Sequence, residues 1–101
     1  MPKRKQTRLG GSKPFTKTTI ENLPNDRPTL YVLERYNKPL YAGVAKRGRV
    51  QDRLKEHLDR NDAPGATTVR VRPMPSIDEA RVAEREFIKD KAPPFNDQHK
   101  P

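Results

Sequence analysis

The stretch from Leu30 to His57 limits the folds open to this chain more than any other part of the sequence. It reads LYVLERYNKPLYAGVAKRGRVQDRLKEH. Two apolar runs of strand length flank the turn-forming segment Asn37-Lys38-Pro39, and a basic segment with helical spacing follows them. We therefore expect a β-hairpin that leads directly into a helix, with the rest of the chain packed around this unit.

Each strand of the expected hairpin, Thr29–Leu33 and Leu40–Val44, carries one tyrosine. Side chains alternate along a strand, so directly paired residues share a face of the sheet. A two-residue turn at 37–38 gives paired residue numbers an odd sum, which places Tyr31 and Tyr41 on opposite faces. The two tyrosines converge only if the loop has an odd length or one strand contains a bulge.

The helix expected after the hairpin runs from about Arg49 to Asp59. Its less polar residues recur at helical spacing: Val50, Leu54, His57 and Leu58. Arg53 precedes His57 by one turn, so their side chains are neighbours on the helix surface. A loop composition follows at 61–65, and alternating residues predict a half-exposed strand over Thr67–Arg72.

A second helix is predicted from Ser76 to about Asp90, because Ser76 and Glu79 have the spacing of a capping box. One face of this helix is apolar: Ile77, Ala80, Ala83, Phe87 and Ile88. Glu84 falls inside that face, and a buried carboxylate is costly unless a cation pairs with it. It therefore needs a metal ion, Arg53 or another basic side chain. The alternatives are a purely structural salt bridge, or a helix rotated so that Glu84 lies at the rim.

Composition sets the remaining limits on this chain. At 101 residues it forms one domain at most, and its 35% of charged residues against 31% hydrophobic ones predicts a disordered portion. The net charge of +9 favours a polyanionic partner, most simply nucleic acid. The absence of cysteine excludes disulfides and thiol chemistry. It also fits a reducing cytoplasm, which is the location that we expect. No apolar run suits a membrane span or a signal peptide, so we expect no membrane partner.

The polar and basic residues 1–26 are expected to form a flexible arm, with a joint at Gly10-Gly11-Ser12. Lys3, Arg4 and Lys5 are candidate contacts to nucleic acid. The alternative is a solvated tail without a function. The folded domain is expected at residues 27–97, followed by a short tail at 98–101.

Five elements of the sequence, in order, resemble the motifs of the GIY-YIG nuclease superfamily. They are Thr29-Leu30-Tyr31, Tyr41-Ala42-Gly43, the R-L-x-x-H pattern from Arg53 to His57, Glu84 with its surroundings, and the closing Asn96. The pattern is most similar to the N-terminal incision domain of the bacterial excision-repair nuclease, an enzyme of DNA repair. This resemblance implies a small α/β domain of the α+β type, with a three-stranded, mainly antiparallel sheet flanked by helices.

The resemblance also implies an activity, the metal-dependent hydrolysis of phosphodiester bonds in DNA. Glu84 would hold a single divalent ion, Mg²⁺ or Mn²⁺, because one carboxylate with waters and phosphate suits such an ion. Arg53 would bind the scissile phosphate through its planar guanidinium. Tyr41 would activate the attacking water and Tyr31 would orient it, or the reverse. A tyrosine has a pKa of about 10, so the base needs a nearby cation.

The remaining implied roles belong to His57 and Asn96. His57 would share in proton transfer or bind phosphate, and Asn96 would hold the region around Glu84 in place. Two positions depart from the family pattern: Thr29 replaces a glycine, and Val44 replaces a basic residue that often follows the second tripeptide. Lys46 or Arg47 would substitute for that charge. The expected contacts to DNA in this region are Gly43, Lys46, Arg47 and Arg49.

Two other functions remain open at this point, namely a catalytically weak or inactive nucleic-acid-binding module of the same fold and a basic RNA-associated protein. For the nuclease, we expect structure-selective or partner-directed cleavage, with a protein partner supplying specificity, since no further domain would read base edges. A protein bound to DNA would be nucleoid-associated. The sequence leaves open the oligomeric state and the pathway, whether repair, recombination, a mobile element or restriction.

Overall fold

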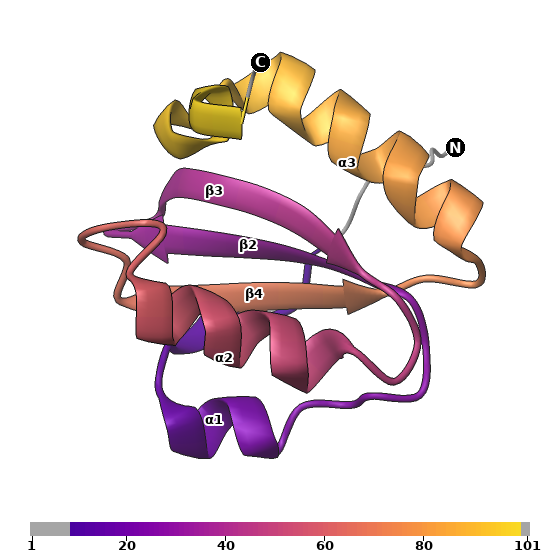
Figure 1. Cartoon of the computed structure of the whole chain (residues 1–101). Coiled ribbons are helices and arrows are strands. Elements are labelled where there is room, and N and C mark those ends of the chain that lie inside the picture. Colours follow the sequence, from indigo (N-terminus) through magenta and orange to yellow (C-terminus); the bar gives the residue numbers. More distant parts are fainter. Residues whose placement is uncertain (1–8, 100–101) are drawn as a thin grey trace.

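The computed structural model describes residues 9–99 of the chain. Its elements, in chain order, are β1 (Lys13–Pro14), α1 (Lys17–Glu21), β2 (Thr29–Arg35), β3 (Lys38–Ala45), α2 (Val50–Arg60), β4 (Thr68–Pro73), α3 (Ile77–Lys91) and the 3₁₀ helix η1 (Pro94–His99). The strands form one antiparallel sheet in the order β1-β4-β2-β3. Helices α1 and α2 cover one face and α3 covers the other (Figure 1). The expected α+β class is confirmed, with four strands instead of three.

Strand β1 is the one that the sequence analysis missed. It consists of two exposed residues, which pair with β4 through Lys13↔Val69 and Pro14↔Thr68. The Gly10 N–H also donates to the Val71 carbonyl, at 3.0 Å. So short a strand, without an apolar side chain, leaves no alternating pattern in the sequence.

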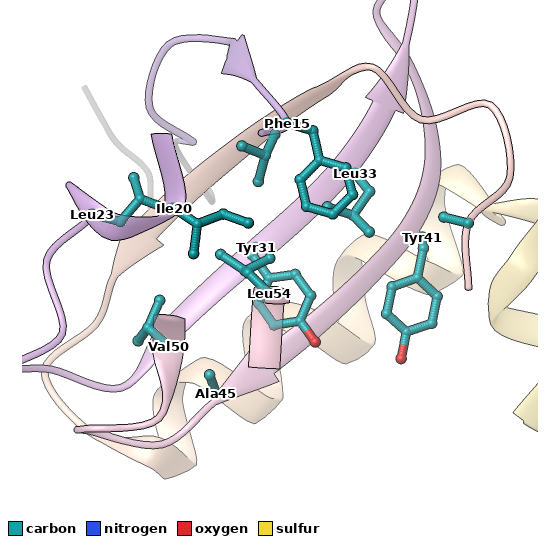
Figure 2. Close-up of a cluster of buried hydrophobic side chains, with 11 residues drawn as sticks. Phe15, Ile20, Leu23, Tyr31, Leu33, Tyr41, Ala45, Val50 and Leu54 are labelled. Carbon is teal, nitrogen blue, oxygen red and sulfur yellow. The ribbon is translucent and has the colours of Figure 1, made fainter. Parts of the chain in front are cut away.

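Residues 9–26 form part of the packed domain, although we expected a flexible arm over residues 1–26. Phe15, Ile20 and Leu23 are buried in a cluster with side chains of β2 and α2 (Figure 2). These apolar residues lie too far apart among polar ones to show a period, yet together they cover the sheet beside α2. The arm residues named above as contacts to nucleic acid lie outside the described residues: Lys3, Arg4 and Lys5.

The hairpin turns one residue earlier than expected, at Tyr36-Asn37. Both residues have left-handed backbone angles, with φ of 51° and 63°. Positive φ at both central positions is the geometry of the two-residue turn that suits the twist of paired strands. Asn37 adopts this conformation readily, whereas Tyr36 does so at a cost in backbone strain.

A bulge in the hairpin brings the two tyrosines to the same face. The pairs nearest the turn, Arg35↔Lys38 and Glu34↔Pro39, have an odd sum, and the register then shifts to Leu33↔Tyr41 with an even sum. The extra residue is Leu40. This meets the condition stated above for convergence, and Figure 2 shows the rings of Tyr31 and Tyr41 on the same side of the sheet.

Both long helices begin and end close to the expected residues. For α3, the Ser76 hydroxyl accepts a hydrogen bond from the Glu79 N–H at 3.1 Å, which confirms the predicted cap. For α2 the cap comes from a distant residue, because Asn25 Oδ1 accepts from the Val50 N–H at 2.8 Å and from the Gln51 N–H at 3.3 Å. The orientation of α2 therefore depends on the segment that precedes β2.

The sheet separates two apolar clusters. The larger cluster lies under α1 and α2 and includes Tyr31, Leu33 and Leu54, whereas the smaller one joins Leu30 to Ala80 and other residues of α3. Six of the seven residues of β2 are buried, because helices cover both faces of this central strand (Figure 1). No helix within residues 9–99 is both long and apolar enough to cross a membrane.

Candidate active site

An open cleft of about 440 Å³ lies along the outer edge of β3, where α2 and α3 approach this strand from the two faces of the sheet. The strand contributes Gly43 and Val44 to its wall. The polar and charged side chains of the wall come from β3, the following loop, α2 and α3: Tyr41, Lys46, Arg49, Arg53, Arg81 and Glu84. Three residues that are far apart in sequence, Tyr41, Arg53 and Glu84, therefore meet in one place.

Tyr31 lies behind the cleft, against Gly43. Its side chain is completely buried, and its hydroxyl lies 2.7 Å from His57 Nε2. A Cβ atom on Gly43 would lie 2.6 Å from the Tyr31 oxygen, so a glycine is needed for the tyrosine to fit. Burial raises the pKa of Tyr31, against an opposing effect of Arg53. Tyr31 is therefore protonated at neutral pH.

Tyr41 is the signature tyrosine that faces the cleft. Its ring centroid lies 4.9 Å from that of His57 and 6.4 Å from that of Tyr31. Burial raises the pKa of Tyr41, whereas the positive charge of Arg53 lowers it. Of the two tyrosines, Tyr41 is the one in the wall that a molecule bound in the cleft would contact.

His57 connects the tyrosines to an acidic residue that the sequence analysis did not single out. Its Nδ1 lies 2.9 Å from Asp62 Oδ2, while its Nε2 faces the Tyr31 hydroxyl. Burial lowers the pKa of His57, although the bond to Asp62 opposes this effect. His57 is buried and does not line the cleft. Asp62 directly follows Asn61, a residue common at helix C-termini, and this was the available sequence signal.

Arg53 reaches the cleft from the middle of α2. Its guanidinium interacts with Tyr31, and this interaction raises the pKa of Arg53. Within residues 9–99, its Nε–H is buried and has no hydrogen-bond partner. An unsatisfied buried donor costs about 1–3 kcal/mol. An anion bound in the cleft could supply the acceptor that this donor lacks.

Glu84 faces the cleft from α3 and is half-buried. Burial raises the pKa of its carboxyl, and Arg81, Arg85 and Arg53 oppose that effect. No hydrogen bond or ion pair joins this carboxylate to any other described residue. Of the alternatives raised by the sequence, a buried salt bridge is therefore excluded for this part of the chain. A half-buried carboxylate at the rim of the apolar face agrees with the structure.

Asn96 acts on β3 and not on the region around Glu84. Its side-chain oxygen accepts from the Ala42 N–H, and its side-chain N–H donates to the Ala42 carbonyl, both at 2.9 Å. Because β3 is an edge strand, these backbone groups have no neighbouring strand to pair with. No hydrogen bond within the described residues joins the Asn96 side chain to the region around Glu84, where we expected it to act. Asn96 instead holds the backbone between Tyr41 and Gly43.

Comparison with known proteins identifies the fold. No protein-family model and no curated protein matches the chain. One similar solved structure is the GIY-YIG N-terminal endonuclease domain of UvrC from Thermotoga maritima, bound to its catalytic magnesium ion. The match has a TM-score of 0.68 and 24% identity, and it covers 78% of this chain and 92% of that domain. Two point mutants of the same domain, Asn→Ala and Tyr→Phe, match with the same TM-score at 24% and 22% identity. The chain has the GIY-YIG fold.

In this GIY-YIG fold, cationic side chains line the cleft from the loop after β3 and from α3, in addition to Arg53 from α2. Lys46 and Arg49 line it from the loop after β3, whereas Arg47 is exposed and does not line it. Arg81 lines the cleft from α3, one turn before Glu84. Arg81 could not be singled out from the sequence, because a basic residue on an exposed helix surface has no distinguishing pattern.

The residues of this GIY-YIG cleft fit a hydrated divalent ion. The described residues contain no group of three or more His, Cys, Asp or Glu side chains that could hold a metal ion. Zinc sites commonly need such a group, but Mg²⁺ keeps several waters and binds through one or two carboxylates. The Glu84 carboxylate, which has no ion-pair partner among the described residues, could bind Mg²⁺ in this way, and Mn²⁺ favours the same oxygen ligands.

Proposed function

We propose that this chain is a metal-dependent endonuclease that hydrolyses phosphodiester bonds in DNA. The observation that carries the proposal is the meeting of Tyr41, Arg53 and Glu84 in one cleft, from β3, α2 and α3. The UvrC domain, which has the same fold, is an endonuclease domain with a catalytic divalent cation. A shared fold alone does not imply shared chemistry, so the residues of the cleft must supply the support for this activity.

The charge of the cleft favours a polyanionic substrate. Four cationic side chains line it, and Glu84 is the only acidic one among the lining residues that the structure describes. Such a cleft attracts phosphates and releases their condensed counterions on binding. The four cations lie on both sides of the carboxylate: Lys46, Arg49, Arg53 and Arg81.

Each of the three central residues has a distinct task in this proposal. Arg53 binds the scissile phosphate, and its buried Nε–H gains an acceptor. Tyr41 orients the attacking water and accepts its proton. Because burial raises the pKa of Tyr41, the phenolate needs the positive charge that Arg53 places beside it. Glu84 holds the divalent cation, which when bound supplies Lewis acidity and neutralises phosphate charge.

Tyr31, His57 and Asn96 have supporting roles in the proposal. Tyr31 packs against Gly43 and interacts with Arg53, so it orients the phosphate-binding group. His57 contacts the Tyr31 hydroxyl through Nε2, and Asn96 fixes the backbone that presents Tyr41. The substrate is expected to be selected by DNA structure or by a protein partner, because the lining cations suit phosphate groups, and phosphate contacts carry no direct sequence information.

The test is a cleavage panel with branched, nicked and plain duplex DNA in the presence of Mg²⁺ or Mn²⁺. The wild type is expected to cut at least one of these, and Glu84→Gln and Arg53→Ala to lose about 10²–10³-fold in rate. Glu86→Gln is the matched control, because Glu86 is exposed on the same helix. No cleavage by the wild type, or full cleavage by Glu84→Gln, contradicts the proposal.

One observation favours a second function, a nucleic-acid-binding module that does not cleave. Val44 lines the cleft where a basic residue often follows the second tripeptide, and it packs against the apolar cluster of α3. Retained DNA binding without nicking in the same panel would support this module. Tighter binding to structured RNA than to DNA at matched salt would instead support an RNA-associated protein.

A further inference from the structure

Asp62 does not line the cleft, but it contacts His57, which lies next to Tyr31 behind the cleft. We infer that Asp62 is a positioning residue, which sets the donor and acceptor roles of His57 and Tyr31 and through them orients Arg53. The part of this inference that concerns cleavage rests on the proposed function. The part that concerns the state of His57 does not.

The end of α2 brings Asp62 back onto the helix. Asn61 adopts a left-handed conformation with φ of 56°, and its N–H donates to the His57 carbonyl. The Asp62 N–H donates to the same carbonyl at 3.3 Å. This turn directs the Asp62 carboxylate toward the ring one turn earlier, where Oδ2 lies 2.9 Å from His57 Nδ1. The side chain of His57 is 7% exposed and that of Asp62 is 30% exposed, so water competes weakly for the bond.

Along the contacts from Asp62 through His57 and Tyr31 to Arg53, one assignment of protons pairs a donor with an acceptor at every step. An ionised carboxylate only accepts hydrogen bonds, so His57 Nδ1 must carry the proton. In a neutral ring Nε2 then has a free lone pair, which accepts from the Tyr31 hydroxyl at 2.7 Å. The Tyr31 oxygen is left as an acceptor for the guanidinium of Arg53, which can only donate.

The opposite tautomer of His57 would disrupt this pairing of donors with acceptors. With the proton on Nε2, the Tyr31 oxygen would have to accept from His57, and its own hydroxyl proton would point toward Arg53. Two donors would then face each other behind the cleft. Tyr31 has little room to move away, because its ring is completely buried and its oxygen contacts Gly43. Burial also lowers the pKa of His57, which favours the neutral ring that this arrangement needs.

The deciding measurement is the tautomer of His57, read from ¹⁵N chemical shifts of the histidine rings at a pH where imidazole is neutral. His99 is the only other histidine in the sequence and serves as a comparison. We expect the wild type to carry the proton on Nδ1. Asp62→Ala should lose this preference, and Asp62→Asn should lose it too, because the side-chain amide can donate to an unprotonated Nδ1 and so admits the opposite tautomer. A wild type with the proton on Nε2, or an Asp62→Ala ring unchanged from the wild type, overturns the inference.

The second measurement is the rate of DNA cleavage. Asp62→Ala should lower kcat by about 10–100-fold, as loss of an orienting partner commonly does. Asp62→Asn should not recover that loss, because its amide does not hold His57 in the Nδ1–H tautomer. Asp59→Ala is the matched control, since Asp59 is an exposed acid near the same helix end. If the wild type cleaves and Asp62→Ala cleaves equally fast, the inference fails. If the wild type cleaves nothing, the proposed function fails, and the tautomer still decides the role of Asp62.

Discussion

Replacing Gly43 by alanine tests whether the close approach of β3 to Tyr31 is needed for both folding and activity. The added Cβ would lie 2.6 Å from the Tyr31 oxygen and 2.7 Å from its Cζ, distances that a folded protein does not tolerate. Tyr31 is completely buried and bonded to His57, so its ring cannot swing into solvent to relieve the contact. Either the ring or the edge strand must move.

The expected cost of Gly43→Ala has two parts. Overpacking a well-filled core costs about 1–3 kcal/mol. Displacing the Tyr31 hydroxyl leaves it and His57 Nε2 buried without partners, which costs about 1–3 kcal/mol more. The midpoints of the two ranges sum to about 4 kcal/mol, which corresponds to a fall in Tm of about 16–32 °C for a domain of this size. The same displacement should abolish DNA cleavage, because Tyr41 and Gly43 share the strand that would move.

Thermal unfolding followed by circular dichroism measures this effect, with Gly11→Ala as the matched control. Gly11 is exposed and a Cβ atom there would meet nothing within 4 Å, so its Tm should match that of the wild type. Combining Gly43→Ala with Tyr31→Phe gives a further check. The hydrogen bond can be lost only once, so the double variant should be more stable than the summed costs by about 1 kcal/mol. A Tm for Gly43→Ala within about 3 °C of the wild type, or strictly additive costs, would refute the reasoning.

Three further outcomes are expected. Glu84→Gln should raise Tm at neutral pH while removing cleavage, because the fold raises the pKa of this carboxyl and so disfavours its charged form; a lower Tm at neutral pH would contradict this. Burial lowers the pKa of His57 in the folded state below the ordinary value of about 6.5. Its contribution to stability is therefore complete above that ordinary pKa and is lost as the pH falls through the lower folded pKa. The difference in Tm between the wild type and His57→Gln, measured from about pH 5 to pH 8, should therefore shift in favour of the variant on acidification; a flat difference would speak against a buried neutral ring. Asn25→Ala should cost about 0.5–2 kcal/mol in chemical denaturation, because α2 loses its cap; no loss would mean that water satisfies the first N–H groups of α2 equally well.

The sequence by itself was sufficient for features that depend on short-range interactions. Helix α3 begins at a capping box, because the Ser76 hydroxyl and the Glu79 N–H lie three residues apart and need no other part of the chain. The two strands of the hairpin and helix α2 follow from apolar periodicity in the same way. The position of Glu84 within an apolar helix face singled it out, and the structure places it in the cleft. The catalytic roles proposed for it and for Tyr41 and Arg53 remain predictions.

Only the tertiary structure decided the features that join distant segments. The bulge at Leu40 depends on how β3 fits between its turn and its neighbours, and it alone brings Tyr31 and Tyr41 to one face. Asn25 caps α2 and Asn96 binds Ala42 across long stretches of chain, and neither contact leaves a local pattern. These contacts form because buried or strand-edge backbone groups must find partners, and which side chain supplies the partner is settled only when the sheet and helices have packed.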